Sequence, residues 1–258
     1  MGEEKIIRFG IIFLFATIAT LIDGGIGMGY GVSLTTLLLS IGVGTAVASA
    51  SVHIAEVVTA LVNGVSHFLL GNFDQKIFTF LAIPGVFGGA LGAYCASHYA
   101  DAVLVRPFVS GLLLILGVLI IVKFTRKREI LELEYERPRV RHLMPLGFVA
   151  AFIDAIGGGG WGPITTPTLV MRNANPQHVI GSVNLAEFFI AFSISLTFFM
   201  TLPSIDLAIV LPMIVAGIIA APLGALITRR LPTRTVGIIV GCVIILLSLR
   251  TIALAFSS

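Results

Sequence analysis

The 258-residue chain is 57% hydrophobic and only 11% charged, with a mean hydropathy of +1.06. A soluble domain carries about 25% charged residues, so this composition excludes an ordinary soluble protein and predicts a polytopic membrane protein. The net charge of +3 comes mostly from basic residues in short loops, which is typical of membrane proteins and does not indicate nucleic-acid binding. Cys95 and Cys242 both lie in apolar runs, which favours helix packing over a disulfide or a metal site.

The apolar segments fall into two similar sets. The first set has a run at residues 6–22, a short run at 32–41 and long runs at 46–70, 77–97 and 103–122. The second set has a run at 143–156, a short run at 163–170 and long runs at 176–202, 207–228 and 233–256. Each long run has about the 20 residues that a membrane-spanning helix needs. We therefore expect an all-α membrane protein with a first transmembrane repeat at 1–122, a linker at 123–142 and a second repeat at 143–258.

Each short run follows a glycine-rich break in otherwise apolar sequence. Residues 157–163 read Gly-Gly-Gly-Gly-Trp-Gly-Pro, and residues 23–31 read Asp-Gly-Gly-Ile-Gly-Met-Gly-Tyr-Gly. A glycine inside a helix costs about 1 kcal/mol relative to alanine, so a helix should end near Gly157 and a new one should begin near Pro163. In a bilayer, broken backbone is tolerated only where it is buried in protein or lines a watery cavity. The two breaks are therefore candidate sites.

The two halves match without a gap when one is shifted by 131 residues. The shift (154 − 23 = 131) pairs Asp23 with Asp154 and Glu56 with Glu187. It also gives the pairs Gly27/Gly158, Tyr30/Trp161, Gly31/Gly162, Thr35/Thr166, Ser51/Ser182, Val52/Val183 and Ala55/Ala186. A match that includes two pairs of acids in apolar sequence indicates an internal duplication.

The orientation of the two repeats depends on whether each broken pair of segments crosses the membrane. If each pair enters and leaves on one side as a hairpin, each half has three full crossings and the repeats are inverted. If each pair crosses once, the repeats are parallel, and the basic residues are nearly as unequally distributed. The compact basic turn at 229–234 favours the inverted arrangement, with the central loop in the cytoplasm. Inverted repeats with discontinuous helices are a recurring plan of secondary transporters.

Such a plan predicts a substrate site between the two breaks. New helix N-termini there would direct free N–H groups and positive dipole ends toward an anion. No lysine or arginine lies in the middle of an expected span, so backbone, hydroxyl and amide groups would hold the substrate. The candidate substrate-binding residues are Gly27, Gly29, Tyr30, Gly31, Thr35, Ser51, His53, Gly158, Gly159, Gly160, Trp161, Gly162, Thr165, Thr166, Ser182 and Asn184. Tyr30 and Trp161 are equally well explained as anchors of the breaks, and His53 as a helix-packing residue.

Four acids lie in or beside the expected membrane segments: Glu56, Glu187, Asp23 and Asp154. An ionisable residue within a span costs about 2.5–3.5 kcal/mol on insertion scales and is a functional candidate by default. We expect Glu56 and Glu187 to take up and release protons, which would couple proton movement to transport. Asp23 and Asp154 either share this role or cap backbone N–H groups of the breaks. His53 lies three residues before Glu56, on the same helix face, and its duplicate is Asn184.

The duplicated breaks, the His67…Gly71-Asn-Phe-Asp74 ending and the Leu-Gly-Ala runs at 91–93 and 223–225 resemble the sulfite exporter TauE/SafE family. The resemblance covers essentially the whole chain outside 123–142. It implies a transporter of sulfite, organosulfonates or related sulfur oxyanions in the bacterial inner membrane. We expect no cofactor and no bound metal, with the anion and the lipid bilayer as partners.

Two other classes of function stay open. A cation or metal-ion transporter is favoured by the surplus of embedded acids over bases, although the chain lacks a dense ligand motif. An intramembrane enzyme is disfavoured because no Gly-x-Ser-x-Gly or His-Glu-x-x-His pattern is present. The leading hypothesis is therefore a secondary transporter of small sulfur oxyanions that works by alternating access and is linked to protons.

Overall fold

The computed structural model describes residues 2–99, 105–125, 138–172, 174–202, 205–227 and parts of the segment 238–253. Within these residues all regular secondary structure is helical. The helices are α1 (Gly2–Ile26), α2 (Tyr30–Ser40), α3 (Thr45–Leu69), α4 (Gln75–Tyr99), α5 (Val105–Thr125), α6 (Val140–Gly157), α7 (Trp161–Met171), α8 (Pro176–Thr201) and α9 (Leu207–Ile227). Most of the linker at 123–142, the basic turn at 229–234 and much of the last expected span lie outside the described residues.

Both glycine breaks separate a long helix from a short one. Gly27 and Gly158 have a φ of +67°, a left-handed conformation in which a helix commonly ends on glycine. Their N–H groups donate to the carbonyls of Asp23 and Asp154 over 2.7 Å, so the two ends have the same geometry. α1 thus extends beyond its expected end at residue 22 and contains Asp23, and α7 begins at Trp161, before Pro163.

Among the described residues, six helices are long and apolar enough to cross a membrane: α1, α3, α4, α6, α8 and α9. Large apolar side chains point outward from them, including Leu14, Phe87 and Phe199, each more than 60% exposed. Water would not favour so much exposed apolar surface, whereas lipid tails would cover it. The chain is therefore an all-α, multi-pass membrane protein, as its composition predicts.

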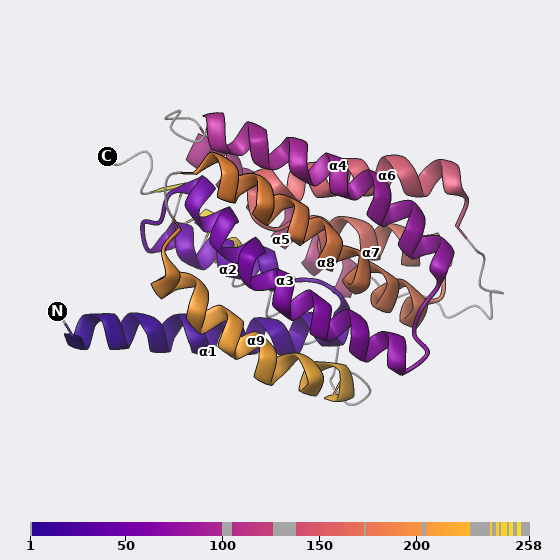
Figure 1. Ribbon diagram of the computed structural model, residues 1–258, viewed down its shortest axis with the longest axis horizontal. Coiled ribbons are helices and arrows are strands. Elements are labelled where there is room, and N and C mark those ends of the chain that lie inside the picture. Colours follow the sequence, from indigo (N-terminus) through magenta and orange to yellow (C-terminus); the bar gives the residue numbers. More distant parts are fainter. Residues whose placement is uncertain are drawn as a thin grey trace.

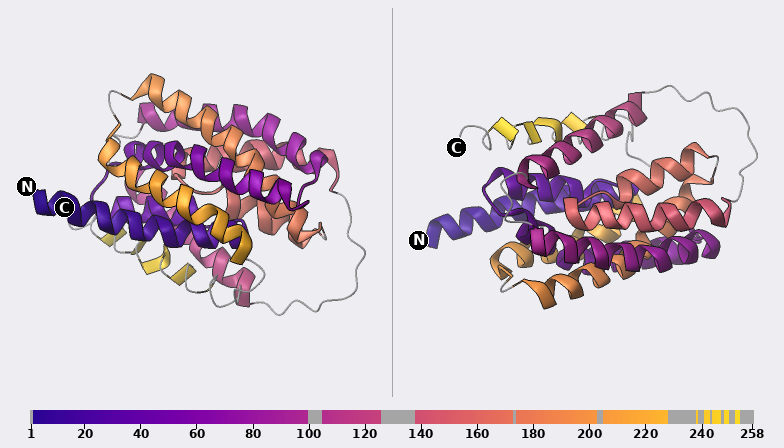
Figure 2. Two further views of the ribbon diagram at one scale, coloured as in Figure 1. Left: turned by 60° about the horizontal axis from the view of Figure 1, so that its bottom comes forward. Right: turned by 90° about the horizontal axis from the view of Figure 1, so that it is seen from above.

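Each pair of a long and a short helix returns to the end of the bundle where it begins. Ile7 near the start of α1 lines the same cavity as Ile41, which follows α2. Pro138 before α6 lines the same cavity as Ala174, which follows α7. α1 begins at the left end of the bundle and α6 at the right end, and both views agree (Figure 1; right view of Figure 2). The two hairpins therefore enter the bundle from opposite ends.

The two halves of the chain interlock through shared cores. One hydrophobic core combines residues of α1, α2, α3, α5 and α9, and the other combines residues of α4, α6, α7 and α8 with Ala46 and Ala50 of α3. α4 packs along α6 and α8, while α9, its counterpart under the 131-residue shift, packs along α1 and α3. Each core thus mixes residues from both sides of the linker. The division into repeats at 1–122 and 143–258 stays a prediction from the sequence.

Glycines bring α4 into direct backbone contact with its neighbours. Gly88 lies against the backbone of Phe148 on α6, and Gly92 lies against that of Phe152 one turn further along. A Cβ on either glycine would overlap a carbonyl oxygen of α6. Small residues spaced by four are the usual means of close helix packing in lipid, where dispersion contacts and not water exclusion drive association.

Replacement of Gly88 by isoleucine is expected to destabilise the protein, because the added side chain forces α4 away from α6. Overpacking of this kind costs about 1–3 kcal/mol. Thermal unfolding in detergent, followed by the fluorescence of the single tryptophan Trp161, measures the effect. The control is Gly10→Ile on the exposed surface of α1, where an added Cβ meets no atom within 4 Å. Equal melting temperatures for the two variants would contradict the packing role of Gly88.

Candidate functional site

The two glycine breaks pack against each other in the protein interior. The hydroxyl of Thr35 on α2 donates a hydrogen bond to the carbonyl of Gly158, and the hydroxyl of Thr166 on α7 donates one to the carbonyl of Gly27 over 2.9 Å. The 131-residue shift converts one bond into the other (35 + 131 = 166; 27 + 131 = 158). Reciprocal contacts of this form are what a two-fold relation produces. The breaks are therefore joined symmetrically.

Glycine is required where the backbones of the two breaks touch. A Cβ on Gly31 would lie 2.9 Å from the Cα of Gly159, and a Cβ on Gly162 would lie 2.8 Å from the Cα of Met28. Real side chains do not approach backbone so closely, so any larger residue would push the breaks apart. Close contact between the breaks thus depends on these two positions.

A cavity of about 10 Å³ lies between the breaks, close to the space that one water molecule needs. It is lined by Asp23, Gly29, Tyr30, Gly31, Val32, Glu56, Asp154, Gly159, Gly160, Trp161, Gly162, Pro163 and Glu187. The structure thus brings together all four predicted acids and most of the predicted glycines. Among the described residues, this lining has four acids and no lysine or arginine. A polyatomic anion cannot fit unless the breaks separate.

Glu56 and Glu187 meet at the centre of the bundle. Each is the twelfth residue of its helix, α3 or α8, and so lies about 17 Å from that helix's start at 1.5 Å per residue. Both carboxyl groups are buried, and they hydrogen-bond to each other. An ionised carboxylate can only accept, so such a bond requires a proton on one partner. The arrangement therefore suits a pair of carboxyl groups that share one proton.

Asp23 and Asp154 hold the first N–H groups of the two short helices. Asp154 Oδ1 accepts hydrogen bonds from the backbone N–H groups of Gly160 at 2.6 Å and Trp161 at 3.1 Å. Asp23 accepts one from the backbone N–H group of Tyr30, the counterpart of Trp161. The capping that the sequence offered as one alternative is thus present at both breaks. The proton-coupling role of these two aspartates stays a prediction.

His53 connects the two halves of the chain. Its Nδ1 lies 2.8 Å from the carbonyl of Ser49, which can only accept, so Nδ1 carries a hydrogen. Its Nε2 lies 3.0 Å from Asp154 Oδ2 and 3.9 Å from Glu56 Oε2. The sequence indicated only the contact with Glu56, whereas the contact with Asp154 is the shorter one. No periodicity could have shown it, because the two residues are 101 positions apart.

The counterpart of His53 on the other side is Asn184, and the two differ in their surroundings. Asn184 is buried, and neither atom of its amide group has a hydrogen-bond partner within the described part of the chain. The same holds for the hydroxyl of Ser51. His53 thus hydrogen-bonds to an acid of the site, whereas the amide group of its counterpart Asn184 has no hydrogen-bond partner among the described residues.

Two predicted site residues are engaged elsewhere. The hydroxyl of Thr165 donates to the carbonyl of Trp161 in its own helix over 2.6 Å. Ser182 accepts from the N–H group of Asp74 at 2.8 Å and donates to the carbonyl of the same residue at 3.1 Å, which fixes the turn before α4. Neither residue lines the central cavity. Their predicted contact with substrate is not visible in this conformation.

Two comparisons with known proteins give matches. The chain matches the sulfite exporter TauE/SafE family over residues 12–251. It is 41% identical over 253 residues to the "Probable membrane transporter protein YtnM" of Bacillus subtilis (strain 168), a match that covers 96% of this chain and 83% of the relative. No solved structure matches the chain.

Replacement of Asp154 by alanine is expected to destabilise the break, because it leaves the N–H groups of Gly160 and Trp161 without their acceptor. A buried donor that loses its partner costs about 1–3 kcal/mol. Asp154→Asn retains a carbonyl oxygen at the same place and should cost less. Thermal unfolding followed by Trp161 fluorescence compares the two variants. Equal losses of stability would show that the cap contributes nothing.

Proposed function

We propose that this chain, which belongs to the sulfite exporter TauE/SafE family, moves small sulfur oxyanions across the bacterial inner membrane. Family membership makes it a membrane transporter and not an enzyme. The substrates that we propose are sulfite or organosulfonates, carried by alternating access and linked to protons. The two repeats are inverted, and the central loop lies in the cytoplasm.

The observation that carries the proposal is the pair of breaks, each with the start of a short helix at one buried cavity. The first N–H groups of α2 and α7 form the kind of anion site that helix N-termini provide. In this conformation the carboxyl groups of Asp23 and Asp154 occupy those N–H groups. We infer that each aspartate acts as an internal anion, whose place an oxygen of the substrate takes when the breaks separate.

Two features support alternating access, namely the closed cavity and the opposite directions of the two hairpins. The cavity is too small for sulfite, so one break must move away from the other before the anion binds. The hairpins enter from opposite ends of the bundle (Figure 1), so separating them toward one end or the other exposes the same site to opposite sides. The two cores described above are the bodies that would rock, a mechanism that inverted repeats commonly support.

The charges around the cavity support proton coupling. Two like unit charges 4 Å apart repel by about 4 kcal/mol at an effective dielectric constant of 20. An oxyanion therefore cannot bind beside several ionised carboxylates that no lysine or arginine offsets. Protons on the Glu56–Glu187 pair, and on His53 beside Asp154, remove this repulsion. Anion binding would thus require protons, and release of the anion would free them.

Sulfite-evoked current in proteoliposomes on a solid support tests this mechanism. We expect a saturable current that increases with an imposed proton gradient. In Glu56→Gln and Glu187→Gln the response to the gradient should be lost, because an amide cannot exchange a proton. Asp206→Asn is the matched control, since Asp206 is exposed before α9 and caps the N–H group of Ala208.

The outcomes of this experiment separate the parts of the proposal. A saturable current that does not change with the proton gradient, in the wild type or in any variant, would support anion transport and contradict proton coupling. No current with sulfite or organosulfonates, together with a current evoked by cations, would overturn the whole proposal.

A cation transporter is the second candidate, and one observation favours it. One ligand atom from each of His53, Glu56 and Asp154 lies within 4.8 Å of the others, and all three residues are buried. Imidazole and carboxylate ligands together suit divalent transition metals. Stabilisation of the purified protein by Mn²⁺ or Zn²⁺ without sulfite would support this candidate if His53→Asn abolishes it. This variant gives position 53 an asparagine, the residue that its counterpart in the second half, Asn184, already has.

A further inference from the structure

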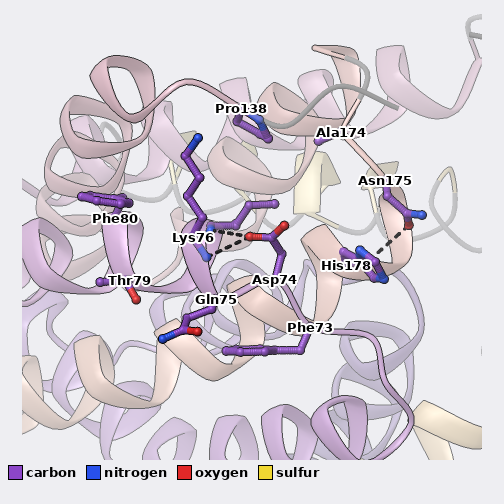
Figure 3. A pocket seen from close by; sticks show the side chains of 11 residues that line it. Phe73, Asp74, Gln75, Lys76, Thr79, Phe80, Pro138, Ala174, Asn175 and His178 are labelled. Atoms are coloured by element: carbon purple, nitrogen blue, oxygen red, sulfur yellow. Dashed lines mark hydrogen bonds between the residues drawn. The ribbon is translucent and has the colours of Figure 1, made fainter. Parts of the chain in front are cut away.

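A second cavity, of about 750 Å³, opens at the end of the bundle where α4, α6 and α8 begin (Figure 3). Its size is in the range of small-molecule sites, which is about 300–1,000 Å³. We propose that this pocket, which we call the α4–α8 pocket, binds an organic oxyanion and is the first docking site of the transported anion. The ligand has a sulfonate, sulfate or phosphate head on a small apolar body. This proposal rests on the proposed function in one respect: it takes the ligand of the pocket to be the anion that the protein transports.

The lining of the α4–α8 pocket has one polar and one apolar part. Figure 3 shows Lys76 and Gln75 at the start of α4, with Asn175 and His178 at the start of α8 across the pocket. The apolar part consists of the rings of Phe73, Phe80 and Pro138. One acid, Asp74, also lines the pocket. Donors on two helices with an apolar floor between them fit a ligand that has an anionic head and an apolar body.

The donors in this pocket are not consumed by the fold. Asp74 directs its Oδ1 to the N–H groups of Lys76 at 2.8 Å and Ile77 at 3.1 Å, and so caps α4. Among the described residues, the ion pairs within 4.0 Å all involve His53, which leaves the ammonium group of Lys76 without one. Asn175 uses its side-chain oxygen to cap α8, at 3.0 Å from the N–H group of Gln177. Its amide nitrogen stays available to donate to a ligand.

The surroundings of the pocket are positively charged. Arg139 directly follows Pro138 of the lining and is exposed. It acts electrostatically on His142 together with Arg141 and Arg172, so these groups gather at the same end of the bundle. The starts of α4, α6 and α8 add their positive dipole ends. An anion in solution is thus attracted to this end before it makes any specific contact.

The opposite end of the bundle provides a control within the molecule. There a cavity of about 620 Å³ is formed by the starts of α1, α3 and α9. The 131-residue shift relates the two cavities, and in the second one His178 is replaced by Val47 and Gln75 by the acid Asp206. Each lining has one acid and one base, Asp74 and Lys76 in the α4–α8 pocket and Asp206 and Arg8 in the other, but the histidine and the amides line only the α4–α8 pocket. The polar lining is therefore not a by-product of the helix arrangement.

Isothermal titration of the full-length protein in detergent with benzenesulfonate tests the proposal. We expect saturable binding that weakens with added salt, because a charged group supplies part of the affinity. Lys76→Gln should weaken binding about tenfold or more, the usual effect of losing a hydrogen bond from a charged group. His178→Gln should weaken it about fivefold, through the loss of the hydrogen bond from the imidazole ring. Arg8→Gln, in the cavity at the opposite end, is the matched control and should leave the affinity unchanged. Unchanged thermal unfolding shows that each variant is folded.

Two results would overturn the proposal. One is the absence of benzenesulfonate binding, or equal weakening in Lys76→Gln and Arg8→Gln. The other concerns lipid, since the phosphate of an anionic lipid offers the same head chemistry. The titration is repeated in nanodiscs with zwitterionic lipid alone and with added phosphatidylglycerol. Displacement of benzenesulfonate by phosphatidylglycerol in the wild type but not in Lys76→Gln would assign the pocket to lipid.

Transport measurements separate this proposal from the proposed function. We expect Lys76→Gln to raise the KM of the organosulfonate-evoked current about tenfold while the maximal current stays unchanged. If the wild type carries current and the variant has the same KM and the same affinity, the docking proposal fails and the transport proposal stands. If the wild type carries no current but the titration follows the expected pattern, the pocket stands and the transport proposal fails.

Discussion

The structure depends on the reciprocal contact between its two glycine breaks. A broken helix inside a membrane protein leaves N–H and carbonyl groups without partners, and each unsatisfied group costs several kcal/mol in a water-free interior. Thr35 and Thr166 satisfy a carbonyl of the opposite break, while Asp23 and Asp154 satisfy N–H groups of their own. Each break is thus stable mainly because the other is present. Gly31 and Gly162 permit the backbone approach that this exchange requires.

In the proposed function, this mutual satisfaction explains how a closed cavity can also be the transport site. The groups that hold the breaks together are side-chain oxygens bound to backbone dipoles, and an oxyanion offers the same kind of oxygen. A substrate that replaces the aspartate carboxyl groups therefore exchanges one set of hydrogen bonds for another, and the cost of separating the breaks is partly offset. The four acids add a condition, because the anion is repelled unless protons neutralise them. In the proposed mechanism, anion binding, proton binding and opening of the site are therefore parts of one event.

The two sides of the site are similar in backbone and different in side chains. The helix ends at Gly27 and Gly158, the threonine bonds and the aspartate caps correspond under the 131-residue shift. His53 and Asn184 do not, and the pockets at the two ends of the bundle differ in the same way. Of the two counterparts only His53 has an imidazole that can hold a proton, and of the two described cavity linings only that of the α4–α8 pocket includes a lysine. In the proposed alternating-access mechanism, unequal side chains on a symmetric scaffold would give the two access states different affinities for the anion.

Much of the helical plan could be predicted from the sequence, because apolar length and glycine breaks are local signals. α3, α4, α8 and α9 begin and end within two residues of their expected bounds. The end of α1 was predicted four residues too early, since Asp23 and the next two glycines continue the helix with ordinary backbone hydrogen bonds. The duplication singled out two acids in each half of the chain, and all four of them line one cavity in the structure.

The remaining features are non-local and leave no periodic trace in the sequence. The contact between His53 and Asp154 joins residues from different halves, and so does the packing of α4 on α6. Ser182 illustrates the converse, since its match with Ser51 indicated a substrate contact although its hydroxyl holds the turn at Asp74. The α4–α8 pocket was missed because its residues come from four separate stretches, none of which carries a motif. Such sites become visible only once the helices are placed in space.

The most direct test of the central claim is the emission of Trp161 during sulfite binding. Trp161 is the single tryptophan and is fully buried. Its backbone N–H group, at the break, donates a hydrogen bond to Asp154. If sulfite binds between the breaks and separates them, its addition at constant ionic strength must shift the emission of Trp161 to longer wavelength as water enters, with saturation. A free tryptophan derivative in the same solutions controls for direct quenching. A protein that carries sulfite current while the emission of Trp161 stays unchanged at saturating sulfite would contradict the claim.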